Sequence, residues 1–188
     1  AFYEHMKTHA HSGVHVGFPG GGQAPLTTAV LLRGEGFLVD VLDHPELSHR
    51  FLSLLAANSI RQREFAAEVT GTSGPLTAIG FTDDYGGLLG PNLYFDFDVQ
   101  YMLRIAAHFG ATSLSIHTEL LRRPHLVILQ DHGFAYIDVG TDPYLTIADC
   151  REVLHIGFLV QMKTSEEMLL STPGAIRRRY REMVEAGA

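Results

Sequence analysis

The chain has little cysteine and little positive charge, and each shortage excludes a class of protein. Its one cysteine, Cys150, rules out an internal disulfide bond and fits a reducing compartment. The 188 residues include 14 Lys and Arg against 21 Asp and Glu, and the net charge of −7 argues against a nucleic-acid partner. No apolar run approaches the roughly 20 residues that span a membrane, and no signal peptide is visible. We therefore expect a cytoplasmic protein that enters no membrane.

A phosphate-binding loop is also missing. The glycine run at residues 19–22 lacks the Gly-Lys-Ser/Thr sequence that such a loop needs. What is present, 46% hydrophobic residues and 19 glycines, fits one α/β domain with tight turns. Five short apolar runs predict strands, at residues 14–18, 76–81, 111–116, 134–139 and 155–160.

Helical patterns separate these strands. They cover residues 26–32, 43–69, 91–109, 125–131, 146–153 and a last segment from residue 173. Asp43 is the expected cap of the second helix. That helix should bury one apolar stripe, made of Leu47, Phe51, Leu54, Leu55 and Ile60. The last helix should turn Tyr180 and Val184 inward. This alternation predicts right-handed βα units around a parallel sheet.

Residues 80–101 form the stretch around which the rest of the chain is expected to be arranged. A buried strand ends in Asp83 and Asp84, a glycine-rich turn follows, and Pro91 begins a helix. Two adjacent carboxylates are costly to desolvate and repel each other, so they need a cation, a protonated partner or water. They predict either a catalytic site or a cluster of surface turns.

A second candidate site follows the strand at residues 111–116. Alternate residues of an extended chain point the same way, so His117 and Glu119 could converge on one metal or substrate. Arg122 could contact an anionic group, although a solvated basic loop is the simpler interpretation. Residues 1–13 carry His5 and His9 at helical spacing, and a helical lead-in is favoured over a metal site there.

These motifs together resemble the uroporphyrinogen decarboxylase superfamily, which also contains the corrinoid and coenzyme M-type methyltransferases. The acidic, glycine-rich block at residues 80–101 resembles the family's Asp-Asp-aromatic-Gly stretch with its later proline and aromatics. Residues 17–29 and 32–46 resemble the family's Thr-x-Ala and Asp-x-Pro-Glu motifs, and residues 170–173 resemble its closing Thr-Pro. The resemblance covers about residues 14–186.

The resemblance implies a TIM (β/α)8 barrel of which the chain holds about the last five strands. The first three would be missing, and residues 14–188 would form the partial barrel domain after the lead-in at 1–13. The chain begins at Ala1 and meets the family pattern in its middle, so we expect a fragment or a partly observed chain. Five strands do not close a barrel, so a homo-oligomer or a partner chain is expected to cover the open edges.

The methyltransferase branch resembles this sequence best. Its members transfer a methyl group between a corrinoid or methylated substrate and a thiol acceptor, and a corrinoid protein is an expected partner. In that branch zinc activates the thiol through a His-x-Cys pair. Here His117 matches the histidine, but Glu119 stands in place of the cysteine, so zinc is the expected metal at an altered site. The resemblance gives Asp83, Asp84, Tyr85 and His117 as catalytic candidates, and Phe18, Asp142 and Arg122 as substrate-binding candidates.

Two alternatives stay open. A uroporphyrinogen decarboxylase would act on a tetrapyrrole without metal, and Tyr85 with the strand-end polar groups would line its pocket. A non-catalytic barrel subunit would keep the fold and lose the ligands, as the change from Cys to Glu119 suggests.

Overall fold

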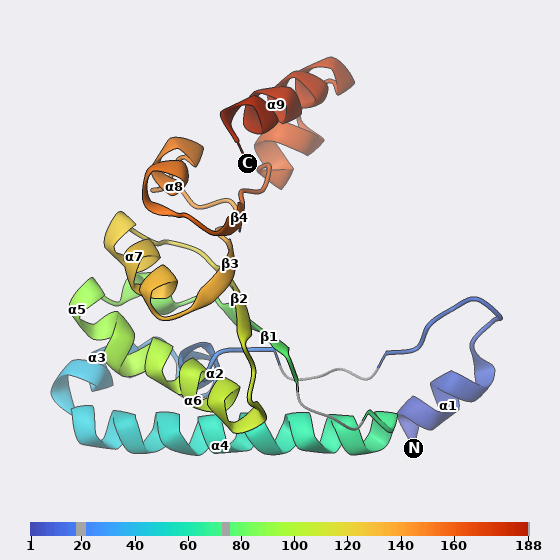
Figure 1. The fold of residues 1–188 in the computed structure, drawn as a ribbon, viewed down its shortest axis with the longest axis vertical. Helices are drawn as coiled ribbons and strands as arrows, with labels where there is room; N and C mark the ends of the chain where they lie inside the picture. The colour runs from blue at the N-terminus through green and yellow to red at the C-terminus, as the bar shows by residue number, and fades with distance from the viewer. Residues whose placement is uncertain (18–21, 73–75, 188) are drawn as a thin grey trace.

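The computed structural model describes residues 1–17, 22–72 and 76–187. In these residues four parallel strands form one sheet in the order β1-β2-β3-β4, which confirms the predicted α/β class (Figure 1). The strands are β1 Ala78–Asp83, β2 Ser113–Thr118, β3 Phe134–Asp138 and β4 Gly157–Leu159. Apolar β-branched and aromatic residues bounded by turns explain why these four runs become strands.

Helices precede, connect and follow the strands. They are α1 Phe2–His9, α2 Pro25–Arg33, α3 Gly36–Asp43, α4 Pro45–Thr70, α5 Pro91–Tyr94, α6 Gln100–Phe109, α7 Arg123–Asp131, α8 Ile147–Val153 and α9 Pro173–Ala186. A 3-10 turn spans Gly86–Leu88, and π-helical turns span Phe95–Val99 and Thr164–Leu169. In the part of the chain described, no helix is both long and apolar enough to cross a membrane.

The sheet has one covered face and one open face. Helices α4, α6, α7 and α8 lie along one side of the strands in Figure 1. Side chains alternate accordingly: Ile79 and Phe81 of β1 and Leu114 and Ile116 of β2 are buried, and the residues between them are not. Parallel strands are usually covered on both faces. This sheet therefore corresponds to an arc of a barrel wall whose inner face is the open one.

The strand predicted at residues 14–18 is wrong over its described part. Residues 14–17 lie in no strand, and the side chain of Val14 is 61% exposed. The apolar residues of this segment therefore bury no face against the protein, although they alternate as in a strand. The segment beside β1 begins later. Thr82 donates its N–H to the Gly22 carbonyl at 2.7 Å and accepts from the Ala24 N–H at 2.8 Å, in a parallel bridge centred on Gln23.

Two predicted helix faces are only partly right. In α4, Leu55 is buried and Phe51 and Ile60 pack against the core as predicted, but Leu47 and Leu54 are 59% and 64% exposed. Leu52 and Ala56 share the buried side instead. Tyr180 and Val184 of α9 are exposed, and Met183 is the buried residue of that helix. The expected cap Asp43 is the last residue of α3, and α4 has no side-chain cap.

The segment after Pro91 forms the helix that the sequence predicts, with one irregularity. A π-helical turn at Phe95–Val99 separates α5 from α6. A π turn adds one residue to the helical ladder and shifts the face that follows. The added residue allows Asp98 to lie buried within the core-facing side. Gly110 ends α6 in the left-handed conformation, as predicted.

Candidate functional site

The open face of the sheet brings together one row of side chains near the carboxyl ends of the strands. In the strand register Thr82 lies opposite His117, His117 lies opposite Asp138, and Asp138 lies opposite Leu159. Residues in register on parallel strands point to the same face. The catalytic candidate His117 on β2 therefore lies beside Asp138 on β3, on the barrel-interior face of the sheet. Asp138 is two strands away from Asp83.

His117 and Asp138 form a hydrogen-bonded pair. The Nδ1 atom of His117 lies 3.0 Å from Oδ2 of Asp138, and the two side chains are 33% and 18% exposed. Gln161 donates from Nε2 to the same Oδ2 at 2.9 Å, and the Gly140 N–H donates to Oδ1 at 2.9 Å. Because a carboxylate only accepts, the neutral imidazole that fits this contact carries its proton on Nδ1 and a lone pair on Nε2. Asp138 thus fixes both the ring orientation and the tautomer.

A cavity of about 280 Å³ lies over this pair. Its lining residues are neutral except for the His117 and Asp138 pair, and no Lys or Arg is among them: Gly22, Gly80, Phe81, Thr82, Ser115, Ile116, His117, Tyr136 and Asp138. A site of this size and composition suits a small organic molecule that is not strongly anionic.

Asp83 and Asp84 do not act as a pair. Asp83 ends β1 on the helix-covered face and is fully buried, while Asp84 is exposed. Asp83 accepts hydrogen bonds from the Thr27 hydroxyl at 3.0 Å, the Gly86 N–H at 3.0 Å and the Thr118 hydroxyl at 3.3 Å. Its carboxyl group therefore ties three segments together within the protein rather than facing the open cavity.

The true partner of Asp83 is Asp98, from the π turn. Both aspartates are fully buried, and Tyr94 lies beside them. Burial raises the pKa of Asp83, and burial together with the nearby Asp83 charge raises the pKa of Asp98 further. No hydrogen-bond donor elsewhere in the protein reaches either oxygen of Asp98, among the described residues. A proton shared between the two carboxyl groups would relieve their repulsion, because two charges without a donor between them repel.

The residues expected to hold zinc do not form a ligand cluster. Glu119 accepts from the Thr141 N–H at 3.0 Å, His117 is engaged with Asp138, and Asp83 faces the other side of the sheet. Across the ranges 1–17, 22–72 and 76–187, no group of three or more His, Cys, Asp or Glu side chains is placed to bind a metal. The described residues therefore do not form the expected zinc site. Whether the protein binds zinc stays a prediction.

Cys150 is not placed as a zinc thiolate either. It lies buried in α8, and burial, followed by the charges of Asp149 and Asp142, raises its thiol pKa to about 11. A thiol with that pKa remains protonated near neutral pH and is a poor metal ligand.

The remaining candidates lie away from the cavity lining. Arg122 donates to the carbonyls of Leu120 and Leu121 at 2.9 and 3.0 Å, and its guanidinium lies 3.3 Å from the centre of the Tyr144 ring. Asp142 accepts from three backbone N–H groups, those of Leu121, Tyr144 and Leu145, at 2.7 to 3.1 Å. Both side chains shape the loops after β2 and β3, and substrate binding by them stays a prediction.

Two further candidates complete the predicted set. Tyr85 packs partly buried against the core, and its backbone N–H contacts Asp83 at 3.4 Å. Phe18 lies outside the described residues. The site that the structure builds contains two residues that the sequence did not single out, Asp138 and Gln161. The available signal was the alternation within residues 134–139, which places Asp138 on the same face as Tyr136.

The fold and the site define an α/β protein of barrel type with its polar groups at the carboxyl ends of parallel strands, where barrel enzymes carry their chemistry. A family model described as uroporphyrinogen decarboxylase (URO-D) matches residues 3–188. The chain belongs to this family, whose fold is of the TIM-barrel type, and the four-stranded arc is consistent with part of such a barrel. No curated protein matches the chain.

Proposed function

We propose that this family member transfers a methyl group to a thiol acceptor in the cavity over the open sheet face, with His117 as the general base. The observation that supports this role is the 3.0 Å contact between His117 Nδ1 and Asp138 Oδ2, which leaves Nε2 of His117 as a proton acceptor. A histidine oriented by a carboxylate is a common way to activate a weak nucleophile.

The proposed step uses His117 and Asp138 of this chain together with two substrates, a thiol acceptor and a methyl donor. Nε2 of His117 takes the proton of the acceptor thiol, and Asp138 stabilises the imidazolium that forms. The thiolate sulfur then attacks the methyl carbon and forms the new carbon–sulfur bond. The bond between the methyl group and its donor breaks, and the donor keeps that electron pair. A methylated corrinoid is the donor class that the family suggests.

The charge of the cavity favours this reaction over tetrapyrrole decarboxylation. A porphyrinogen carries several acetate and propionate groups, which need cationic partners. The cavity lining contains Asp138 and neither Lys nor Arg. Arg63, which contacts the lining residues Gly80 and Phe81, already donates to the Gly80 carbonyl at 3.1 Å, and Arg122 lies away from the lining. Decarboxylation remains the second candidate, because the matching family model carries that name.

The test compares both reactions on the full chain and on two histidine variants. We expect wild-type protein to transfer methyl from methylcobalamin to 2-mercaptoethanol and to leave uroporphyrinogen unchanged. His117→Ala should lower the methyl-transfer rate by about 10²- to 10⁴-fold, the usual contribution of a general base. His108→Ala is the matched control, because His108 pairs with Glu64 at 2.8 Å outside the cavity lining.

Three results would overturn the proposal. Loss of carboxylate from uroporphyrinogen without methyl transfer would favour the decarboxylase. Equal rates for His117→Ala and wild type would remove His117 from the chemistry. Absence of both reactions, together with a stable complex with a second protein, would favour a non-catalytic subunit.

A further inference from the structure

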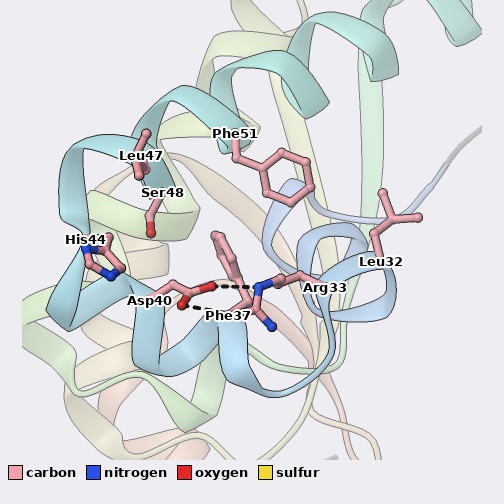
Figure 2. Close-up of a pocket in the computed structure, with 8 residues that line it drawn as sticks. All are labelled: Leu32, Arg33, Phe37, Asp40, His44, Leu47, Ser48 and Phe51. Carbon is pink, nitrogen blue, oxygen red and sulfur yellow. Dashed lines mark hydrogen bonds and ion pairs between the residues drawn. The ribbon is translucent and has the colours of Figure 1, made fainter.

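A second cavity lies among the helices that precede the sheet, apart from the site just described. It has a volume of about 390 Å³ and is formed by α2, α3 and the first turns of α4 (Figure 2). None of its lining residues belongs to the sheet or to the cavity over His117. Its size falls within the range of small-molecule sites, and the proposed methyl transfer makes no use of it.

The walls of this cavity are apolar. Phe37 is buried, and its ring meets that of Phe51 edge to face with centroids 5.8 Å apart. Leu32 and Leu47 stand at the rim and are 68% and 59% exposed. Exposed leucines beside a recessed aromatic pair leave apolar surface in water that a ligand would cover.

One polar group inside the cavity lacks a partner. Ser48 is 2% exposed, and its Oγ has no hydrogen-bond partner among the described residues. Figure 2 shows this hydroxyl directed between Phe37, Asp40 and His44, within the ring of lining side chains. A buried hydroxyl without a partner is unfavourable. A ligand atom that accepts from Ser48 would satisfy it once a lining side chain moves, because Oγ itself is buried.

The charges around the cavity determine the kind of polar group that fits. Arg33 and Asp40 already pair with each other, at 3.0 Å between Nε and Oδ2, so the lining demands no ionic partner. The Asp40 carboxylate would repel an anionic head group. The amino end of α4, which no side chain caps, adds partial positive charge that favours an acceptor oxygen.

We propose that this α2–α4 cavity binds an uncharged amphipathic molecule, with a compact apolar body against Phe37 and Phe51 and one acceptor oxygen on the Ser48 hydroxyl. The proposal is independent of methyl transfer. It assigns a ligand-binding site to the helical layer, outside the sheet that carries the family's chemistry.

The test uses heptan-2-one as the probe in a two-dimensional NMR titration of the full chain. We expect saturable shifts confined to α2, α3 and the start of α4. Ser48→Ala should weaken the affinity about three- to tenfold, which corresponds to one hydrogen bond. The variant should still fold, because it removes an unsatisfied buried group. Ser59→Ala is the matched control: Ser59 lies on the same helix, is buried and also lacks a partner, but it lines a different cavity.

Each other outcome overturns the proposal. Shifts that do not saturate, or that spread over all exposed leucines, would mean non-specific contact. Equal affinity of Ser48→Ala and wild type would remove the polar anchor. Heptanoate binding as tightly as heptan-2-one would contradict the uncharged head group. Shifts at the same residues on raising protein concentration alone would mean that a second copy of the chain occupies the cavity.

Discussion

At the scale of single residues, the buried pair of Asp83 and Asp98 makes stability depend on pH. The folded protein raises the pKa of both groups, chiefly through burial. A raised pKa in the folded state contributes stability that is fully present below the unfolded value of about 4 and is lost as pH rises through the folded value. The free energy of unfolding should therefore fall on going from pH 5 to pH 8.

Asp98→Asn should remove part of this loss. The amide can donate to Asp83 without a titrating proton, so the variant should exceed wild type by on the order of 1 kcal/mol at pH 8 and differ less at pH 5. Urea denaturation at the two pH values measures this. Asp96→Asn is the control, because Asp96 lies in the same π turn but is exposed. A variant that is less stable than wild type at both pH values would show that the shared proton does not govern how stability changes with pH.

Residue-level prediction succeeded where local spacing was sufficient. His117 was expected at the end of a strand, and it lies there. Asp83 and Asp84 were expected to lie together at the end of a strand, but β1 ends at Asp83, whose carboxyl is buried, while the carboxyl of Asp84 is exposed. Asp138 was missed because its role comes from register with β2, which shifts between Leu114 and Ser115 and leaves no trace in the sequence of either strand.

At the scale of elements, the turn after β1 depends on glycine for space rather than for backbone angle. A Cβ on Gly87 would collide with the Glu119 carbonyl and come within 2.5 Å of the Leu120 carbonyl. Backbone atoms cannot move aside cheaply. Leu120 itself holds a positive φ of 63°, a sparsely populated conformation for leucine.

Gly87→Ala should therefore destabilise the protein by about 1–3 kcal/mol, the usual cost of overpacking. Gly90→Ala is the matched control, since a Cβ on Gly90 meets nothing within 4 Å, and it should cost less than about 1 kcal/mol as a change at a helix cap. Chemical denaturation of both variants decides the matter. Equal losses of stability in the two variants would show that the loop after β2 moves aside easily.

The elements themselves were largely predictable from the sequence. Four apolar runs bounded by turn residues became β1 to β4, and Pro25, Pro45, Pro91 and Pro173 each begin a helix. The buried side of α4 was predictable only in part. Leu55 is buried as predicted, but apolar residues such as Leu47, Leu52 and Leu54 lie all around the helix, and packing against α2 and α6 selects among them.

At the scale of the whole molecule, the sheet has two outer edges. Beside β1, Arg63 donates to the Gly80 carbonyl at 3.1 Å and the Gln23 bridge pairs Thr82. Beyond β4 the described residues add no further strand. Unpaired strand edges are templates for association, and coverage of these edges by a second copy or another chain stays a prediction.

Sedimentation velocity over a range of protein concentrations tests that prediction. We expect self-association that weakens in Leu159→Lys, because a charge on the edge strand β4 opposes pairing. Leu170→Lys, at an exposed position outside the sheet, should associate like wild type. A chain that remains monomeric at every concentration would contradict self-association.

Asp138 is proposed to orient His117 for proton transfer, and the Asp138→Asn variant tests that role. The variant keeps the size of the side chain, but an amide can donate as well as accept. It therefore no longer holds the proton of His117 on Nδ1. We predict that methyl transfer from methylcobalamin to 2-mercaptoethanol slows by at least about tenfold, as for loss of a supporting carboxylate. Glu64→Gln, in the control pair with His108, should have the wild-type rate. A wild-type rate for Asp138→Asn would contradict the claim.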